Sequence, residues 1–126
     1  MENNLSIKIC GINNKETAKV CNDVDYVGFV FYQKSTRFVT AFQAKEISKF
    51  LPKTAKKVGL FVNANLDLIE HITEFVNLDF IQLHGGENLS TIKALKQRLN
   101  KPIIKAIPID SLKDVEMSKK FEPFCE

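Results

Sequence analysis

The chain has 126 residues, a length that suits a single domain with room for a hydrophobic core. With 44% apolar and 26% charged residues, its composition is that of a folded globular protein and argues against disorder. The net charge of +3 is modest and the lysines are spread along the chain, so we expect no nucleic-acid partner. No apolar run is long enough for a membrane span, and no secretory leader is expected.

The cysteines indicate the compartment. Cys10, Cys21 and Cys125 are odd in number and far apart, which favours a reducing cytoplasm over a disulfide framework. No pair has the CxxC spacing, and with only two histidines they do not form a usual zinc-binding set. We therefore expect a cytoplasmic protein without a bound metal.

Strand and helix patterns alternate along the whole chain. Strands are expected over residues 6–10, 26–31, 57–62, 79–84 and 102–107. The first helix is expected to reach about residue 22, and a last helical or irregular piece to open at Asp110. Thr40 is the expected N-cap of the second helix, Pro52 should stop that helix, and Asn63 is expected to cap the third.

Apolar side chains at helical spacing predict the buried helix faces. The predicted sets are Ala18 and Val20; Phe42, Ala44, Ile47 and Phe50; Leu66, Ile69, Ile72 and Val76; and Leu89, Ile92 and Leu95.

Five consecutive strand–helix units predict a parallel sheet with right-handed crossovers in one domain, residues 1–126. Two architectures fit this pattern. One is a complete flavodoxin-like sheet, and the other is the first part of a (β/α)8 barrel, which normally needs roughly 200 residues or more. The element pattern alone does not choose between them.

Polar residues stand at the ends of several predicted strands, where chemistry sits in parallel α/β proteins. Alternation places Lys8 and Cys10 on one face of the first strand, and Gly11 allows a tight exit turn. A nearby cation such as Lys8 would favour a thiolate at Cys10, although a cysteine at a strand end is more often a small inert apolar residue. Gln82 and His84 share a face of the fourth strand, where polar side chains either hydrogen-bond loop backbone or line a site.

The loops after the strands offer two weaker signals. Arg37 lies in a loop with a second cation and two hydroxyl groups, which suits an anionic ligand, although a loop arginine is more often solvated. Gly85 and Gly86 would leave helix amide groups exposed, but they lack the fuller glycine pattern of a phosphate-binding loop. A flavodoxin-like phosphoacceptor or flavin site would need residues that the loops after the first and third strands do not supply.

Six ordered blocks together resemble the phosphoribosylanthranilate isomerase family of tryptophan biosynthesis. They are KICGI (8–12), YVGFVF (26–31), KSTRF (34–38), VGLFVN (58–63), QLHG (82–85) and IKAI (104–107). The resemblance implies a (β/α)8 barrel, of which this chain would supply about the first five βα units, an incomplete barrel.

The resemblance also implies a reaction, an Amadori rearrangement that uses no cofactor. The substrate N-(5-phosphoribosyl)anthranilate becomes 1-(2-carboxyphenylamino)-1-deoxyribulose 5-phosphate. By resemblance Cys10 is the general base, while Arg37, Gln82, His84 and Gly11 belong to the substrate-binding set.

The family's general acid is an aspartate at the end of a sixth strand, and its phosphate site follows the seventh and eighth strands. No aspartate of this chain matches that position, so we expect the 126-residue chain to be inactive alone. Exposed strand edges would also favour self-association, which gives an alternative function as a non-catalytic half-barrel fragment. A third hypothesis is the related indole-glycerol-phosphate synthase. That enzyme requires catalytic lysine and glutamate residues on its strands, and Cys10 does not suit it.

Overall fold

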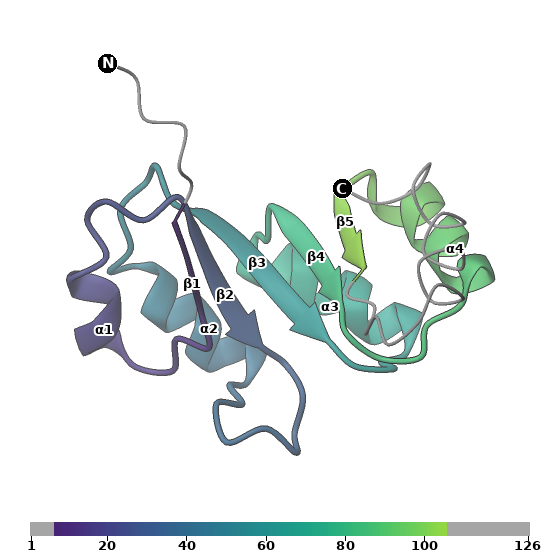
Figure 1. The fold of residues 1–126 in the computed structure, drawn as a ribbon, viewed down its shortest axis with the longest axis horizontal. Helices are drawn as coiled ribbons and strands as arrows, with labels where there is room; N and C mark the ends of the chain where they lie inside the picture. Colours follow the sequence, from purple (N-terminus) through teal and green to yellow (C-terminus); the bar gives the residue numbers. More distant parts are fainter. Residues whose placement is uncertain (1–6, 106–126) are drawn as a thin grey trace, which may run out of the picture.

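The computed structural model describes residues 7–105 (Figure 1). Its elements, in chain order, are β1 (Lys8–Cys10), α1 (Lys15–Lys19), β2 (Tyr26–Val30), α2 (Ala41–Ser48), β3 (Lys56–Phe61), α3 (Leu66–Val76), β4 (Phe80–Leu83), α4 (Leu89–Leu99) and β5 (Ile103–Lys105). The last two residues of the predicted fifth strand, the piece expected from Asp110 and Cys125 lie outside the described residues.

The strands form one parallel sheet in the order β1-β2-β3-β4-β5, so each strand pairs with the next one along the chain. Successive helices pack against one another, with α2 and α3 behind the sheet and α1 and α4 beyond its two ends (Figure 1). A flavodoxin-like sheet would show the order 2-1-3-4-5 and helices on both faces. The sequential order is that of a (β/α)8 barrel, so the flavodoxin-like alternative is wrong.

The sheet has one apolar face, turned toward the helices, and one mixed face. Side chains on the helix face are fully buried in the core: Val27, Phe29, Phe61, Ile81, Leu83 and Ile103 are all 0% exposed. By alternation, the other face carries Lys8, Cys10, Tyr26 and Gln82. The sheet is curved toward this second face, because the ammonium of Lys8 on β1 reaches the side-chain oxygen of Gln82 on β4. We call this second face the concave face.

The third and fourth helices bury the predicted apolar stripes. Ile69, Ile72 and Val76 are buried on α3, and Ile92 and Leu95 on α4. Leu66 and Leu89, the first residue of each stripe, are only partly buried, because a helix end lies at the edge of the core.

The first two helices are shorter than predicted. Helix α1 ends at Lys19 instead of reaching residue 22, and Val20 is 74% exposed while Ala18 is buried. Helix α2 ends at Ser48, and Phe42 and Phe50 are 65% and 42% exposed. The prediction that these two phenylalanines are buried is therefore wrong, because a helix of eight residues turns only Ala44 and Ile47 into the core.

The helix caps follow from local sequence. Thr40 caps α2 as predicted: its hydroxyl accepts from the Gln43 nitrogen, and the Gln43 side chain accepts from the Thr40 nitrogen. Helix α3 is capped by Asn65, so the prediction that Asn63 caps it is wrong. No helix within residues 7–105 has the length and apolar character needed to cross a membrane.

Candidate active site at the carboxyl ends of the strands

Cys10 is the last residue of β1, and its side chain lies on the exposed concave face. It pairs in register with Gly28 of β2. A Cβ atom at Gly28 would stand 3.2 Å from the Cys10 sulfur and 3.3 Å from the Cys10 Cα. The absence of a side chain at position 28 therefore makes the room that the thiol occupies. An exposed thiol in this position suits a base, whereas a thiol buried among aliphatic groups would not.

Arg37 packs directly against the turn that follows Cys10. Its Nη1 atom donates to the carbonyl oxygen of Cys10 at 3.1 Å. Gly11 has a φ of 84°, and a Cβ there would stand only 2.4 Å from Cδ of Arg37. Both the backbone conformation and the space thus require glycine at position 11. The structure brings Cys10, Gly11 and Arg37 together and leaves the guanidinium exposed beside the thiol-bearing residue.

Gln82 lies on the concave face of β4 and accepts a hydrogen bond from the ammonium of Lys8. Because Lys8 and Cys10 are on the same face of β1, this contact brings β4 toward the strand that carries the thiol. The amide oxygen of Gln82 is thereby engaged, so its amide nitrogen is the group left to donate to a ligand.

His84 follows β4 and is exposed. Its backbone nitrogen donates to the Phe61 carbonyl at 2.9 Å, which holds it beside the end of β3. Among the described residues, the His84 side chain makes no hydrogen bond or ring contact with Cys10. The structure thus places His84 on the same rim as Cys10 without a direct link.

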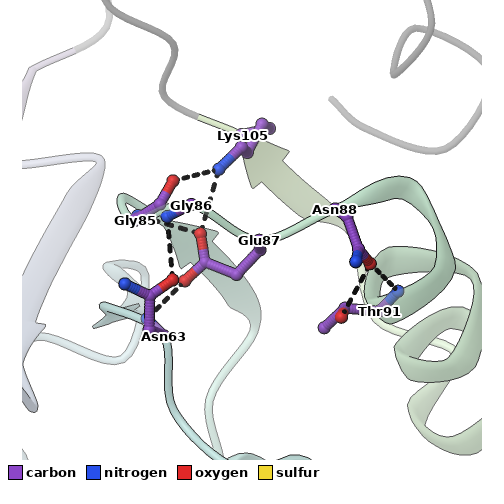
Figure 2. A network of polar contacts seen from close by, with 7 residues as sticks. All are labelled: Asn63, Gly85, Gly86, Glu87, Asn88, Thr91 and Lys105. Carbon is purple, nitrogen blue, oxygen red and sulfur yellow. Dashed lines mark hydrogen bonds and ion pairs between the residues drawn. The ribbon is translucent and has the colours of Figure 1, made fainter.

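A network of polar contacts, centred on a nearly buried ion pair, joins the carboxyl ends of β3, β4 and β5 (Figure 2). We call it the Glu87 network; its members are Asn63, Gly85, Gly86, Glu87 and Lys105. The Glu87 carboxylate accepts from the Asn63 nitrogen at 2.7 Å, from the Gly85 nitrogen at 2.8 Å and from the Lys105 ammonium at 2.9 Å. Lys105 also donates to the Gly85 carbonyl at 2.5 Å, and Asn63 Oδ1 accepts from the Gly86 nitrogen at 2.8 Å.

The ion pair in this network is nearly removed from solvent, with side-chain exposures of 6% for Lys105 and 2% for Glu87. Burial acts to raise the pKa of Glu87, but the hydrogen bonds from Lys105 and from the Asn63 backbone outweigh it and hold the pKa below its ordinary value of 4.5. Glu87 is therefore a charged carboxylate at neutral pH.

Sequence reasoning missed this network. Gly85 and Gly86 were expected to leave helix amide groups exposed, whereas their own nitrogens donate to Glu87 and Asn63. Asn63 has a φ of 50° and serves the network in place of a helix cap. Two sequence signals could have indicated the network: Glu87 directly follows a Gly-Gly pair, and Lys105 lies inside an apolar strand.

Within residues 7–105 no three His, Cys, Asp or Glu side chains gather as a metal-binding group would.

A groove of about 520 Å³ lies between the segment after β2 and α3, lined among others by Phe31, Tyr32, Thr40, Leu68 and His71. None of the predicted site residues lines it.

Comparison with known proteins decides the family. A family model described as N-(5'phosphoribosyl)anthranilate (PRA) isomerase matches residues 7–124. The chain belongs to the PRA isomerase family. It is 42% identical over 120 residues to N-(5'-phosphoribosyl)anthranilate isomerase of Bacillus thuringiensis, covering 94% of this chain and 56% of that protein. The enzyme of the same name from Thermotoga neapolitana is 39% identical, with 94% of this chain and 58% of that protein covered.

Solved PRA isomerase structures share the fold. The crystal structure of the Thermotoga maritima enzyme superposes with a TM-score of 0.87 at 36% identity, covering 95% of this chain and 58% of that one. A PRA isomerase in complex with reduced 1-(o-carboxyphenylamino)-1-deoxyribulose 5-phosphate gives a TM-score of 0.87 at 35% identity, with 95% and 62% covered. The fold is thus that of part of a PRA isomerase barrel, and the chain spans about half the length of the curated relatives that it matches.

Proposed function

We propose that this chain supplies the thiol base and part of the substrate-binding rim of a PRA isomerase. The observation that carries the proposal is the exposed Cys10 at the end of β1, with Arg37 bound to its carbonyl oxygen. The proposed substrate is N-(5-phosphoribosyl)anthranilate, since a relative of the same fold is solved with a reduced form of the product.

In the proposed reaction, an acid protonates the furanose ring oxygen, and the ring opens to a protonated Schiff base. The Cys10 thiolate then takes the proton from C2, which gives an enolamine. The enolamine tautomerises to the ketone of 1-(2-carboxyphenylamino)-1-deoxyribulose 5-phosphate. The exposed guanidinium of Arg37 would bind an anionic group of the substrate, and Gln82 and His84 would line the same rim.

The acid of this scheme has no counterpart among the described residues. We therefore expect no turnover from the 126-residue chain alone, and turnover when it is joined to the remaining part of the Bacillus thuringiensis relative. Measuring conversion of the substrate by both proteins tests this. Turnover by the 126-residue chain alone would contradict the requirement for the missing acid.

The role of Cys10 is tested by Cys10→Ser in the joined protein. We expect kcat to fall by about 100-fold or more, with little change in the affinity for the reduced product, because the change removes a base and little contact area. Arg37→Met is the matched comparison, for which binding should weaken. Equal losses of turnover and binding in Cys10→Ser would indicate a packing role for the cysteine.

The alternative function, a self-associating half-barrel, rests on a different observation. Within the described sheet, β1 and β5 each pair with one neighbour only, so each presents an unpaired edge. A neighbour with a TM-score of 0.85 is a structure of monomers generated from the dimeric Thermotoga maritima enzyme, so self-association occurs in a relative of this chain. Sedimentation of the 126-residue chain distinguishes the cases: a defined dimer favours this alternative, and a stable monomer contradicts it.

A further inference from the structure

Glu87 and Lys105 take no part in the chemistry proposed above, yet they form the buried ion pair of the described chain. Glu87 is the one charged residue of that part classed as buried, at 7% exposure. Burying two charges is costly unless the geometry satisfies them, and a pair of apolar side chains would often serve stability equally well. The pair therefore calls for an explanation beyond packing.

We propose that Glu87 and Lys105 are positioning residues that fix His84 at the rim of the site. The proposal rests on the proposed function, since the rim is the substrate-binding edge of the PRA isomerase fold. The two residues would act by holding the backbone that follows β4.

The contacts act on both sides of His84. Before it, the His84 nitrogen donates to the Phe61 carbonyl at the end of β3. After it, the Gly85 nitrogen donates to Glu87 at 2.8 Å, and the Gly85 carbonyl accepts from Lys105 at 2.5 Å. The peptide group before His84 is thus tied to β3, and the one after it to Glu87, which is paired with Lys105 of β5. Figure 2 shows Glu87 between Asn63 and Lys105, with both of its oxygens engaged.

Only a carboxylate can fill the central position. Three donors converge on it: the nitrogens of Asn63 and Gly85 and the ammonium of Lys105. A glutamine has one acceptor oxygen and a donating amide group, so in either orientation at least one of the three donors would face another donor. Gly85 has no spare room, because a Cβ there would stand 2.8 Å from Asn63 Oδ1.

The test uses the 126-residue chain and its two histidines as reporters. His84 adjoins the network, whereas His71 stacks on Phe75 of α3 and serves as an internal control. In Glu87→Gln and in Lys105→Met, NMR should show displaced His84 ring signals with His71 unchanged. In Glu87→Gln, which removes the charged acceptor of the Gly85 amide, hydrogen exchange at that amide should accelerate on the order of tenfold or more.

The matched control is Arg98→Met, which removes an exposed ion pair of Arg98 on α4 with Asp67 and Glu70 on α3. It should leave His84 and the Gly85 amide unchanged. Unmoved His84 signals in folded Lys105→Met would overturn the proposal, and so would an equal response of both histidines. Should Glu87→Gln not fold, Lys105→Met decides alone.

Binding of the reduced product separates this proposal from the proposed function. In the joined protein, Lys105→Met should weaken binding of the reduced product, while Arg98→Met should not. If the unaltered joined protein does not bind the reduced product, the proposed function fails. The His84 signals still judge the positioning role in that case.

Discussion

At the scale of single residues, two glycines set the surroundings of Cys10. Gly28 leaves the space beside the sulfur, and Gly11 provides both the positive φ and the space for Arg37. The site therefore depends on two positions where a side chain is absent. Each can be tested without an activity assay, because the thiol itself is a chemical reporter.

We expect Gly28→Ala to slow alkylation of Cys10 by iodoacetamide, because the new methyl group would lie 3.2 Å from the sulfur. The same crowding should lower the free energy of unfolding by about 1–3 kcal/mol. The alkylation rate, followed by mass spectrometry, checks the first expectation, and urea unfolding checks the second.

Both proteins should carry Cys125→Ser, which leaves Cys10 and the buried Cys21. Cys21 donates to the Thr17 carbonyl and should stay unmodified in both, which controls for loss of the fold. Equal alkylation rates in the two proteins would show that Gly28 does not shape the thiol's surroundings.

At the scale of secondary-structure elements, the Glu87 network connects three strand ends by one carboxylate. The pKa of Glu87 lies below its ordinary value of 4.5 in the folded protein. A carboxylate of this kind stabilises the fold at pH values above its ordinary pKa. Its contribution is lost as the pH falls through the lowered, folded-state pKa.

Urea unfolding of the unaltered chain and of Glu87→Gln over a pH series tests this direction of the pH dependence of stability. At pH 7 the unaltered chain should be more stable by about 3–5 kcal/mol, the usual cost of breaking a buried pair. The difference should shrink below pH 4.5, as the carboxylate becomes protonated. A difference that stays constant down to pH 3 would show that the charge of Glu87 does not stabilise the fold.

The sequence predicts contacts between residues that are close along the chain better than contacts between distant ones. Thr40 and Gln43 make a cap within one turn, so the pattern alone predicts it. Along the sequence Glu87 precedes α4 and Lys105 follows it, so their contact is not visible as a local pattern. Taken singly, each resembles an ordinary solvated charge. For Phe42 and Phe50 the local pattern predicted burial, but both side chains are exposed. Helical spacing predicts a buried face only where the helix is long enough for that face to contact the core.

At the scale of the whole molecule, the curvature of the sheet distinguishes a barrel segment from an open sheet. Strand order gives the topology, and the Lys8–Gln82 contact reports the curvature, because it spans β1 to β4. The family resemblance named Cys10, Gly11 and Arg37 as site residues, and the structure brings these three residues into contact. The alternation of strand faces alone did not show that Lys8 reaches the fourth strand.

We expect Lys8→Met to displace the side-chain amide signals of Gln82 in NMR spectra while lowering the free energy of unfolding by less than about 1 kcal/mol, since the contact is exposed. Lys56→Met is the matched control, because Lys56 is an exposed lysine on β3 in register with Tyr26, the neighbour of Lys8 on β2. Gln82 signals that respond equally to both changes would argue against the contact across the concave face.

The sequential strand order also bears on how the chain acquires its structure during synthesis. Each pairing needs only the strand that has just emerged and the one before it. The chain entropy lost on closing each loop is therefore moderate, and no pairing must wait for a distant segment. The sheet can extend one βα unit at a time as the ribosome releases it. The growing edge then offers a template to the next strand and is the surface that chaperones would need to protect.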